Sequence, residues 1–166
     1  MRWESFVALI SSFGLYIFIE NKTIKKQPHP ADVKLFQDFL NLLPAASHAI
    51  YFLKEHDFKA IFEIDLIYSL ARFKNIWNDA EHQFIDKEIE HLKLQFHKAI
   101  VDFLEYSALH TFPTTNNFQV VPKEWQFEQS QKYFEVTRKL NNLAGYAYEQ
   151  YRKLVEKGRI KLIIEK

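Results

Sequence analysis

The spacing of apolar residues constrains this chain most, because they recur every three or four positions over long stretches. Between residues 85 and 103 they would form one side of a helix that Asp86 can cap and that runs to about His110. A similar pattern begins at Trp125 and continues for about thirty residues, and Gly158 is placed to end it. The first helix therefore has an apolar stripe of Ile85, Ile89, Leu92, Phe96, Ala99, Ile100 and Phe103.

Three shorter helices are predicted before these two. Asp32 can cap a helix that ends before Pro44, and a short helix follows from Ala45 to about Glu55. Asp57 can cap a third helix, Phe58 to Trp77, which carries apolar residues on two faces. The pattern as a whole predicts an all-α fold, an antiparallel bundle of about four main helices over residues 27–166, with residues 1–26 as an added hydrophobic segment.

The composition agrees with a packed domain and excludes several functions. Hydrophobic residues make up 48% of the chain and only 3 residues are Gly, so it is not typical of a disordered tail. Lys and Arg number 22 and Asp and Glu 21, so no strong positive field exists and nucleic acid is not expected as a partner. With no Cys, the chain has no disulfides, thiolate nucleophiles or Cys-based metal sites.

The amino-terminal segment from Ser5 to Ile19 is uncharged and bears on location. As a helix it would span roughly 23 Å, somewhat less than the ~30 Å hydrocarbon core of a bilayer. If it inserts, Lys22, Lys25 and Lys26 outweigh Arg2, which places the bundle in the cytoplasm, anchored to the inner membrane.

The same segment has two other interpretations. It can be a buried helix of a soluble cytoplasmic core, or Leu15–Ile19 can form a strand that pairs with Ile160–Glu165. In the inserted form, Ala8 and Ser12 would offer a close-packing face for self-association.

Asp65, Ser69 and Arg72 are the first candidate site, because they align between the two apolar faces of the predicted 58–77 helix. If both faces are covered, these side chains are partly buried and the two charges must be paired or hydrogen-bonded. They are therefore interpreted either as a structural contact to a neighbouring helix or as a ligand-binding cleft.

His82, Asp86, Glu88 and His91 form the densest group of candidate metal ligands. Glu88 and His91 have the Glu-x-x-His spacing of di-iron bundles, although both flank the apolar stripe of their helix. A solvated helix start, with acids that favour the helix dipole, explains the same residues. No cofactor is expected.

A thinner apolar stripe on the 86–110 helix includes Leu94, His97, Val101 and Leu104 and needs a partner of its own. It is a candidate interface, and His97 could make helix contact there sensitive to pH.

The favoured function is a non-enzymatic helical interaction module, anchored to a membrane or homo-oligomeric, with a protein partner or a second copy as its ligand. Two alternatives remain open from the sequence. One is a small ligand- or metal-binding bundle enzyme, and the other is a toxin or defence effector that acts on membranes.

Overall fold

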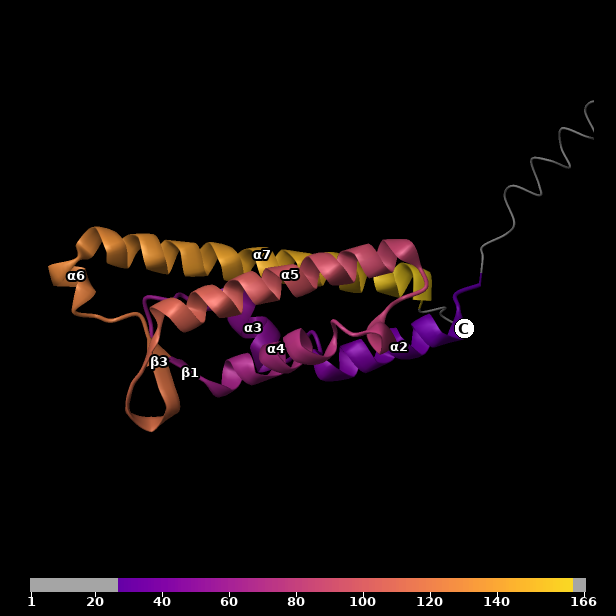
Figure 1. Ribbon diagram of the computed structural model, residues 1–166, viewed down its shortest axis with the longest axis horizontal. Helices are drawn as coiled ribbons and strands as arrows, with labels where there is room; N and C mark the ends of the chain where they lie inside the picture. The colour runs from indigo at the N-terminus through magenta and orange to yellow at the C-terminus, as the bar shows by residue number, and fades with distance from the viewer. Residues whose placement is uncertain (1–26, 163–166) are drawn as a thin grey trace, which may run out of the picture.

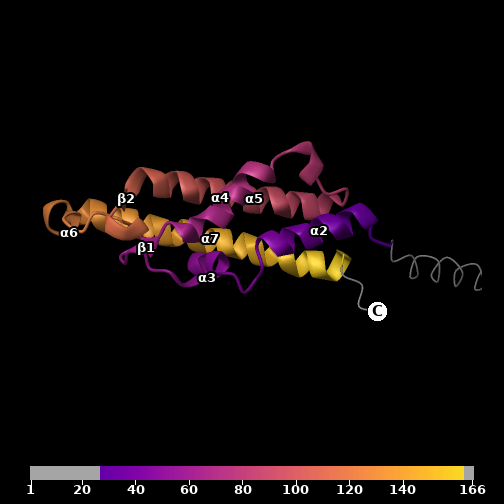
Figure 2. The same cartoon turned by 90° about the horizontal axis from the view of Figure 1, so that it is seen from below.

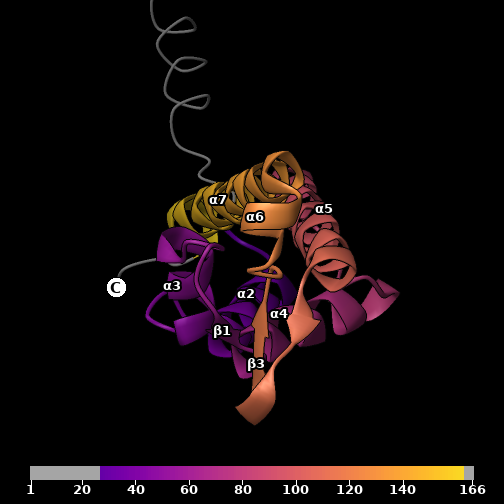
Figure 3. The same ribbon diagram turned by 90° about the vertical axis from the view of Figure 1, so that its left-hand side faces the viewer.

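The computed structural model describes residues 27–162, which form a helical bundle with a small sheet at one end. This confirms the predicted all-α bundle. Figure 1 shows the two longest helices, α5 and α7, side by side along the long axis, and Figure 3 shows α2, α3 and α4 as a second layer beneath them. The helices are α2 (Pro30–Leu42), α3 (His48–Glu55), α4 (Asp65–Ile76), α5 (Lys87–His110), α6 (Trp125–Glu128) and α7 (Ser130–Leu162).

The helix α5 follows its prediction closely. Asp86 is the N-cap residue, and its carboxylate accepts hydrogen bonds from the backbone N–H groups of Glu88 and Ile89. The predicted stripe faces α7 and the core, except that Ile85 is exposed. A local cap and a regular apolar stripe therefore suffice to place this helix.

A three-stranded antiparallel sheet closes one end of the bundle, with strand order β1-β3-β2. Phe62 pairs with Gln119 and Phe112 with Val120. Between β2 and β3, Asn116 and Asn117 have positive φ angles of 66° and 65°, which Asn adopts more readily than most residues. The strands are β1 (Phe62–Glu63), β2 (Phe112–Pro113) and β3 (Phe118–Val120).

This sheet explains why the prediction of a 58–77 helix was wrong at its start. The chain first makes a turn at Asp57 and then pairs as β1, so α4 begins only at Asp65. Phe58 and Phe62 are both buried, and their spacing of four positions resembles a helical stripe although neither belongs to a helix.

Two other helix ends differ from expectation. Asp32 does not cap α2, because His29 is the N-cap residue and accepts the N–H of Ala31 through its ring. The predicted final helix is two helices, α6 and α7, with a break at Gln129, and α7 continues past Gly158 to Leu162. Figure 2 shows α7 running alongside α2 at this end.

The helical end of α7 also corrects the proposed terminal β pairing, since residues 160–162 are helical. The rest of that pairing, together with the Ser5–Ile19 segment and its Ala8 and Ser12, lies outside the described residues. Among the helices described, none is both long and apolar enough to cross a bilayer. The membrane anchor stays a prediction.

Gly158 lies where α7 packs closely against the Phe36 ring of α2. A Cβ atom at this position would overlap the ring carbons of Phe36, which is 1% exposed and stacks on Phe39. Gly145, in the same helix, has nothing within 4 Å of the corresponding position. The glycine that resembles a helix stop in the sequence is therefore a packing requirement.

We expect Gly158→Ala to lower the free energy of unfolding by about 1–3 kcal/mol, because the buried Phe36 ring must shift. Gly145→Ala is the matched control and should raise it by about 0.5–1 kcal/mol, as Ala favours a helix interior. Urea unfolding monitored by circular dichroism measures both. Equal effects of the two substitutions would contradict the close approach.

Candidate interaction site

The Asp65, Ser69 and Arg72 side chains do not form a buried strip. Asp65 and Arg72 are exposed and Ser69 is half-buried, because one of the two apolar faces of α4 is only partly covered and leaves Tyr68 exposed. Asp65 accepts a hydrogen bond from the side-chain amide of Asn117 at 3.0 Å, which ties the start of α4 to the β2–β3 turn. The expectation that both faces are covered was wrong, and this contact is one between a helix and a turn.

The four candidate metal ligands do not form one cluster. His82 Nδ1 lies 2.6 Å from Asp79 Oδ1, and His91 is exposed. Asp86 and Glu88 face α7, where they pair with lysines. Within residues 27–162, no group of three or more His, Cys, Asp or Glu side chains is placed to hold a metal ion.

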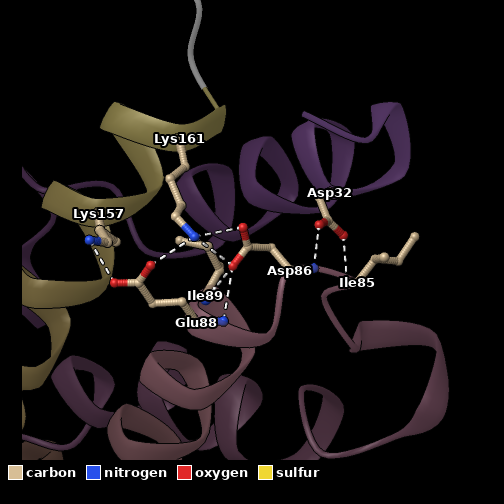
Figure 4. Close-up of polar contacts among 7 residues, drawn as sticks. All are labelled: Asp32, Ile85, Asp86, Glu88, Ile89, Lys157 and Lys161. Carbon is tan, nitrogen blue, oxygen red and sulfur yellow. Dashed lines mark hydrogen bonds and ion pairs between the residues drawn. The ribbon is translucent and has the colours of Figure 1, made fainter. Parts of the chain in front are cut away.

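Figure 4 shows what Asp86 and Glu88 do instead. Lys161 Nζ lies 2.8 Å from Asp86 Oδ2 and 2.7 Å from Glu88 Oε2, and Lys157 Nζ lies 2.6 Å from Glu88 Oε1. On the other side, the buried Asp32 carboxylate accepts the backbone N–H groups of Ile85 and Asp86, both at 2.8 Å. These contacts join α2, the start of α5 and the end of α7.

The pKa values of these groups reflect the pairing. Burial raises the pKa of Asp86, but hydrogen bonds from Lys161 and from two backbone N–H groups outweigh it, so the net pKa is lowered. Hydrogen bonds from Lys157 and Lys161 lower the pKa of Glu88, and those from Lys161 to Asp86 and Glu88 raise the pKa of Lys161. All three groups are therefore charged at neutral pH, and their ion pairs hold the start of α5 against the end of α7.

The thinner stripe of α5 has a partner within the chain. His97 Nε2 donates to the backbone oxygen of Lys74 at 2.8 Å, and its ring lies against Phe73, so this stripe packs against α4. Leu104 is buried, Val101 is half-buried, and only Leu94 of the four is exposed. The predicted interface is therefore largely an internal helix contact.

A different set of exposed apolar side chains lies at the end of the bundle where α5 ends and α6 and α7 begin (Figure 1). Phe127 is 88% exposed, Leu109 71% and Phe112 47%. Because these residues are far apart in the sequence and outside any regular stripe, sequence analysis missed them. We call this surface the aromatic end patch; its residues are Tyr106, Leu109, His110, Phe112, Trp125 and Phe127.

Ring contacts hold part of the aromatic end patch together. The rings of Phe112 and Trp125 lie 6.1 Å apart in an edge-to-face arrangement, and those of Tyr106 and His110 lie 4.2 Å apart. These contacts join β2 to α6 and fix the last turn of α5. These four rings are thus held in place, and rigid rings lose little entropy on binding.

Two lysines of α7 flank the patch. Lys132 Nζ lies 3.6 Å from the centre of the Trp125 ring and Lys139 Nζ lies 4.3 Å from that of Tyr106. Burial, followed by the charges of Lys132 and Lys139, lowers the pKa of His110, so this imidazole is neutral at pH 7. The patch therefore combines exposed rings with two cations at its edge.

Comparisons with protein-family models, curated proteins and solved structures found no match for this chain. The surface chemistry of the bundle is therefore the basis for its proposed function.

The contact between α5 and α7 predicts a pH dependence of stability. Asp86 and Glu88 have lowered pKa values in the folded state, so their contribution is present above about pH 4 to 5 and is lost as pH falls through the folded values. Lys161→Met should lower the urea midpoint at pH 7, and the deficit should shrink as pH falls toward 2. Urea unfolding at a series of pH values measures this deficit.

Lys153→Met is the matched control, because Lys153 is an exposed residue of α7 and forms no ion pair with the other residues that the structure describes. Its midpoint should follow the wild type at every pH. A Lys161→Met deficit that stays constant from pH 7 to pH 2 would contradict the assigned role of the pairs.

Proposed function

We propose that this protein is a non-enzymatic helical interaction module that binds a partner protein through the aromatic end patch. The exposure of Phe127, Leu109 and Phe112 on one end of the bundle carries the proposal. Fully burying one such side chain contributes about 1.5–3 kcal/mol, so a partner that covers the three gains substantial apolar contact. Aromatic anchors of this kind dominate the binding energy of many protein interfaces.

The charge around the patch favours a protein over nucleic acid. Lys123, Lys132 and Lys139 are offset by Glu124, Glu128 and Glu135, so no single-sign field surrounds the patch. Mixed charges around exposed rings resemble the polar rim of a protein interface.

The position of the patch supports binding to a partner outside the bundle. Residue 27, where the described part of the chain begins, lies at the opposite end from α6 (Figure 1). A partner bound at the patch therefore approaches an end distant from the amino-terminal connection.

The ligand-binding alternative has less support. Its candidate residues Asp65 and Arg72 are exposed, and neither lines the groove of about 660 Å³ beside α7. A catalytic site usually gathers polar groups in a concave, water-excluding pocket, and these residues have no such surroundings.

The test is site-specific photo-crosslinking in cells of the natural host. A photoreactive phenylalanine analogue replaces Phe127 in one variant and Tyr51, which is 64% exposed on α3, in the control variant. We expect a discrete crosslinked product with one other protein from position 127 only. With that protein purified, Phe127→Ser should weaken binding by about tenfold or more and Tyr51→Ser should leave it unchanged.

Two outcomes contradict the proposal. The same products from positions 127 and 51 would mean nonspecific contact, and a crosslinked dimer of this chain alone would replace the partner with self-association.

A further inference from the structure

A shallow groove of about 660 Å³ runs along the amino-terminal half of α7, beside the turn at residues 57–60. Lys59 of the turn lines the groove from one side. The other side is formed by side chains of α7, which include Gln131, Phe134, Glu135, Arg138 and Asn142.

Asn141 fixes the turn against α7. Its side-chain oxygen accepts the N–H of Phe58 at 3.1 Å, and its side-chain nitrogen donates to Asp57 Oδ1 at 3.2 Å. The same Asp57 oxygen accepts the N–H of Lys59 at 3.1 Å, while the Phe58 ring is fully buried. The backbone of Lys59 is therefore held on both sides, so the groove is preformed.

The charges that line the groove are unequal. Lys59 and Arg138 have no ion pair within residues 27–162, and Asp57 beside Lys59 already accepts two hydrogen bonds. Glu135 is the one carboxylate among the described lining residues. It accepts a hydrogen bond from Gln131 at 2.9 Å, and its charge also acts on Tyr106 of α5.

The groove also has an apolar contact surface. Phe134 is 58% exposed, and its ring lies edge-on to the buried ring of Tyr133, which limits its movement. The groove therefore combines Lys59 and Arg138, which have no ion pair within residues 27–162, with the Asn142 side-chain amide and one exposed ring.

We propose that this groove binds an acidic, extended segment of the partner protein. A carboxylate of the segment pairs with the Arg138 guanidinium, a second lies near Lys59, and an apolar side chain between them packs on Phe134. The proposal rests on the proposed function, since it names the chemistry of that partner. Charge complementarity favours an acidic protein segment, and the chain's net charge of +1 disfavours nucleic acid.

The experiment uses the full ¹⁵N-labelled chain and two synthetic peptides, Ac-EEFEE-NH2 and Ac-QQFQQ-NH2, at low ionic strength. We expect the acidic peptide to shift the signals of the Arg138 side-chain Nε–H and the Asn142 side-chain amide saturably. The neutral peptide should bind at least fivefold more weakly, and 0.3 M NaCl should weaken binding of the acidic peptide.

The matched variants are Arg138→Gln and Arg72→Gln, because Arg72 is also exposed and has no ion pair in the described part of the chain. Arg138→Gln should weaken binding of the acidic peptide about tenfold, and Arg72→Gln should not change it. Equal binding of the two peptides, an equal loss in both variants, or equally strong shifts with inorganic phosphate would overturn the proposal.

The proposals for the groove and for the aromatic end patch can be contradicted separately. Phe127→Ser should leave binding of the acidic peptide unchanged, since Phe127 does not line the groove. A groove that binds the peptide in a protein whose patch yields no crosslink would contradict only the proposed function. A crosslinked partner together with no peptide selectivity would contradict only the acidic segment.

Discussion

The packing of aromatic rings around Phe39 is the interaction on which the rest of the bundle depends. This fully buried ring of α2 contacts Phe73 of α4, Trp77 directly after α4, Phe96 of α5 and Tyr151 of α7, at centroid distances from 5.4 to 6.1 Å. Four helices therefore meet at one side chain. Mostly edge-to-face or tilted geometries fix relative orientation as well as distance, which a core of aliphatic residues does less strictly. The hydroxyl of Tyr151 donates to the Leu43 oxygen, and burial raises its pKa to about 12, so it stays neutral.

Polar contacts between distant parts of the chain then position the two ends of the bundle. Asp32 and Lys161 hold the start of α5 at one end. At the other, Asn141 holds the turn after α3, and Asn117 holds the start of α4. The buried Lys93 of α5 makes another polar contact, because its ammonium group pairs with Glu90 and donates to the backbone oxygen of His82, before the start of α5. In these contacts, one polar group provides the hydrogen-bond partner that the other needs when folding removes water from it.

Sequence reasoning could predict the features that depend on neighbouring residues. The cap of α5 by Asp86 and its apolar stripe are local, and both were confirmed. Sequence reasoning failed where a side chain binds a residue that is remote in the sequence. Asp32 resembles a helix cap, but its carboxylate accepts backbone N–H groups 53 and 54 residues away. Similarly, Gly158 resembles a helix stop, whereas the Phe36 ring on another helix requires it. The aromatic end patch as a whole carried no periodic signal, because its residues are divided among α5, β2 and α6 and only Trp125 belongs to a predicted stripe.

The length of α7 has a consequence for how the two ends of the molecule relate. Its 33 residues extend about 50 Å as one helix, with α5 packed against much of that length. The aromatic end patch lies at its beginning and residue 27 near its far end (Figure 1). The bundle thus has the geometry of a spacer, because one continuous helix sets the distance between its two ends.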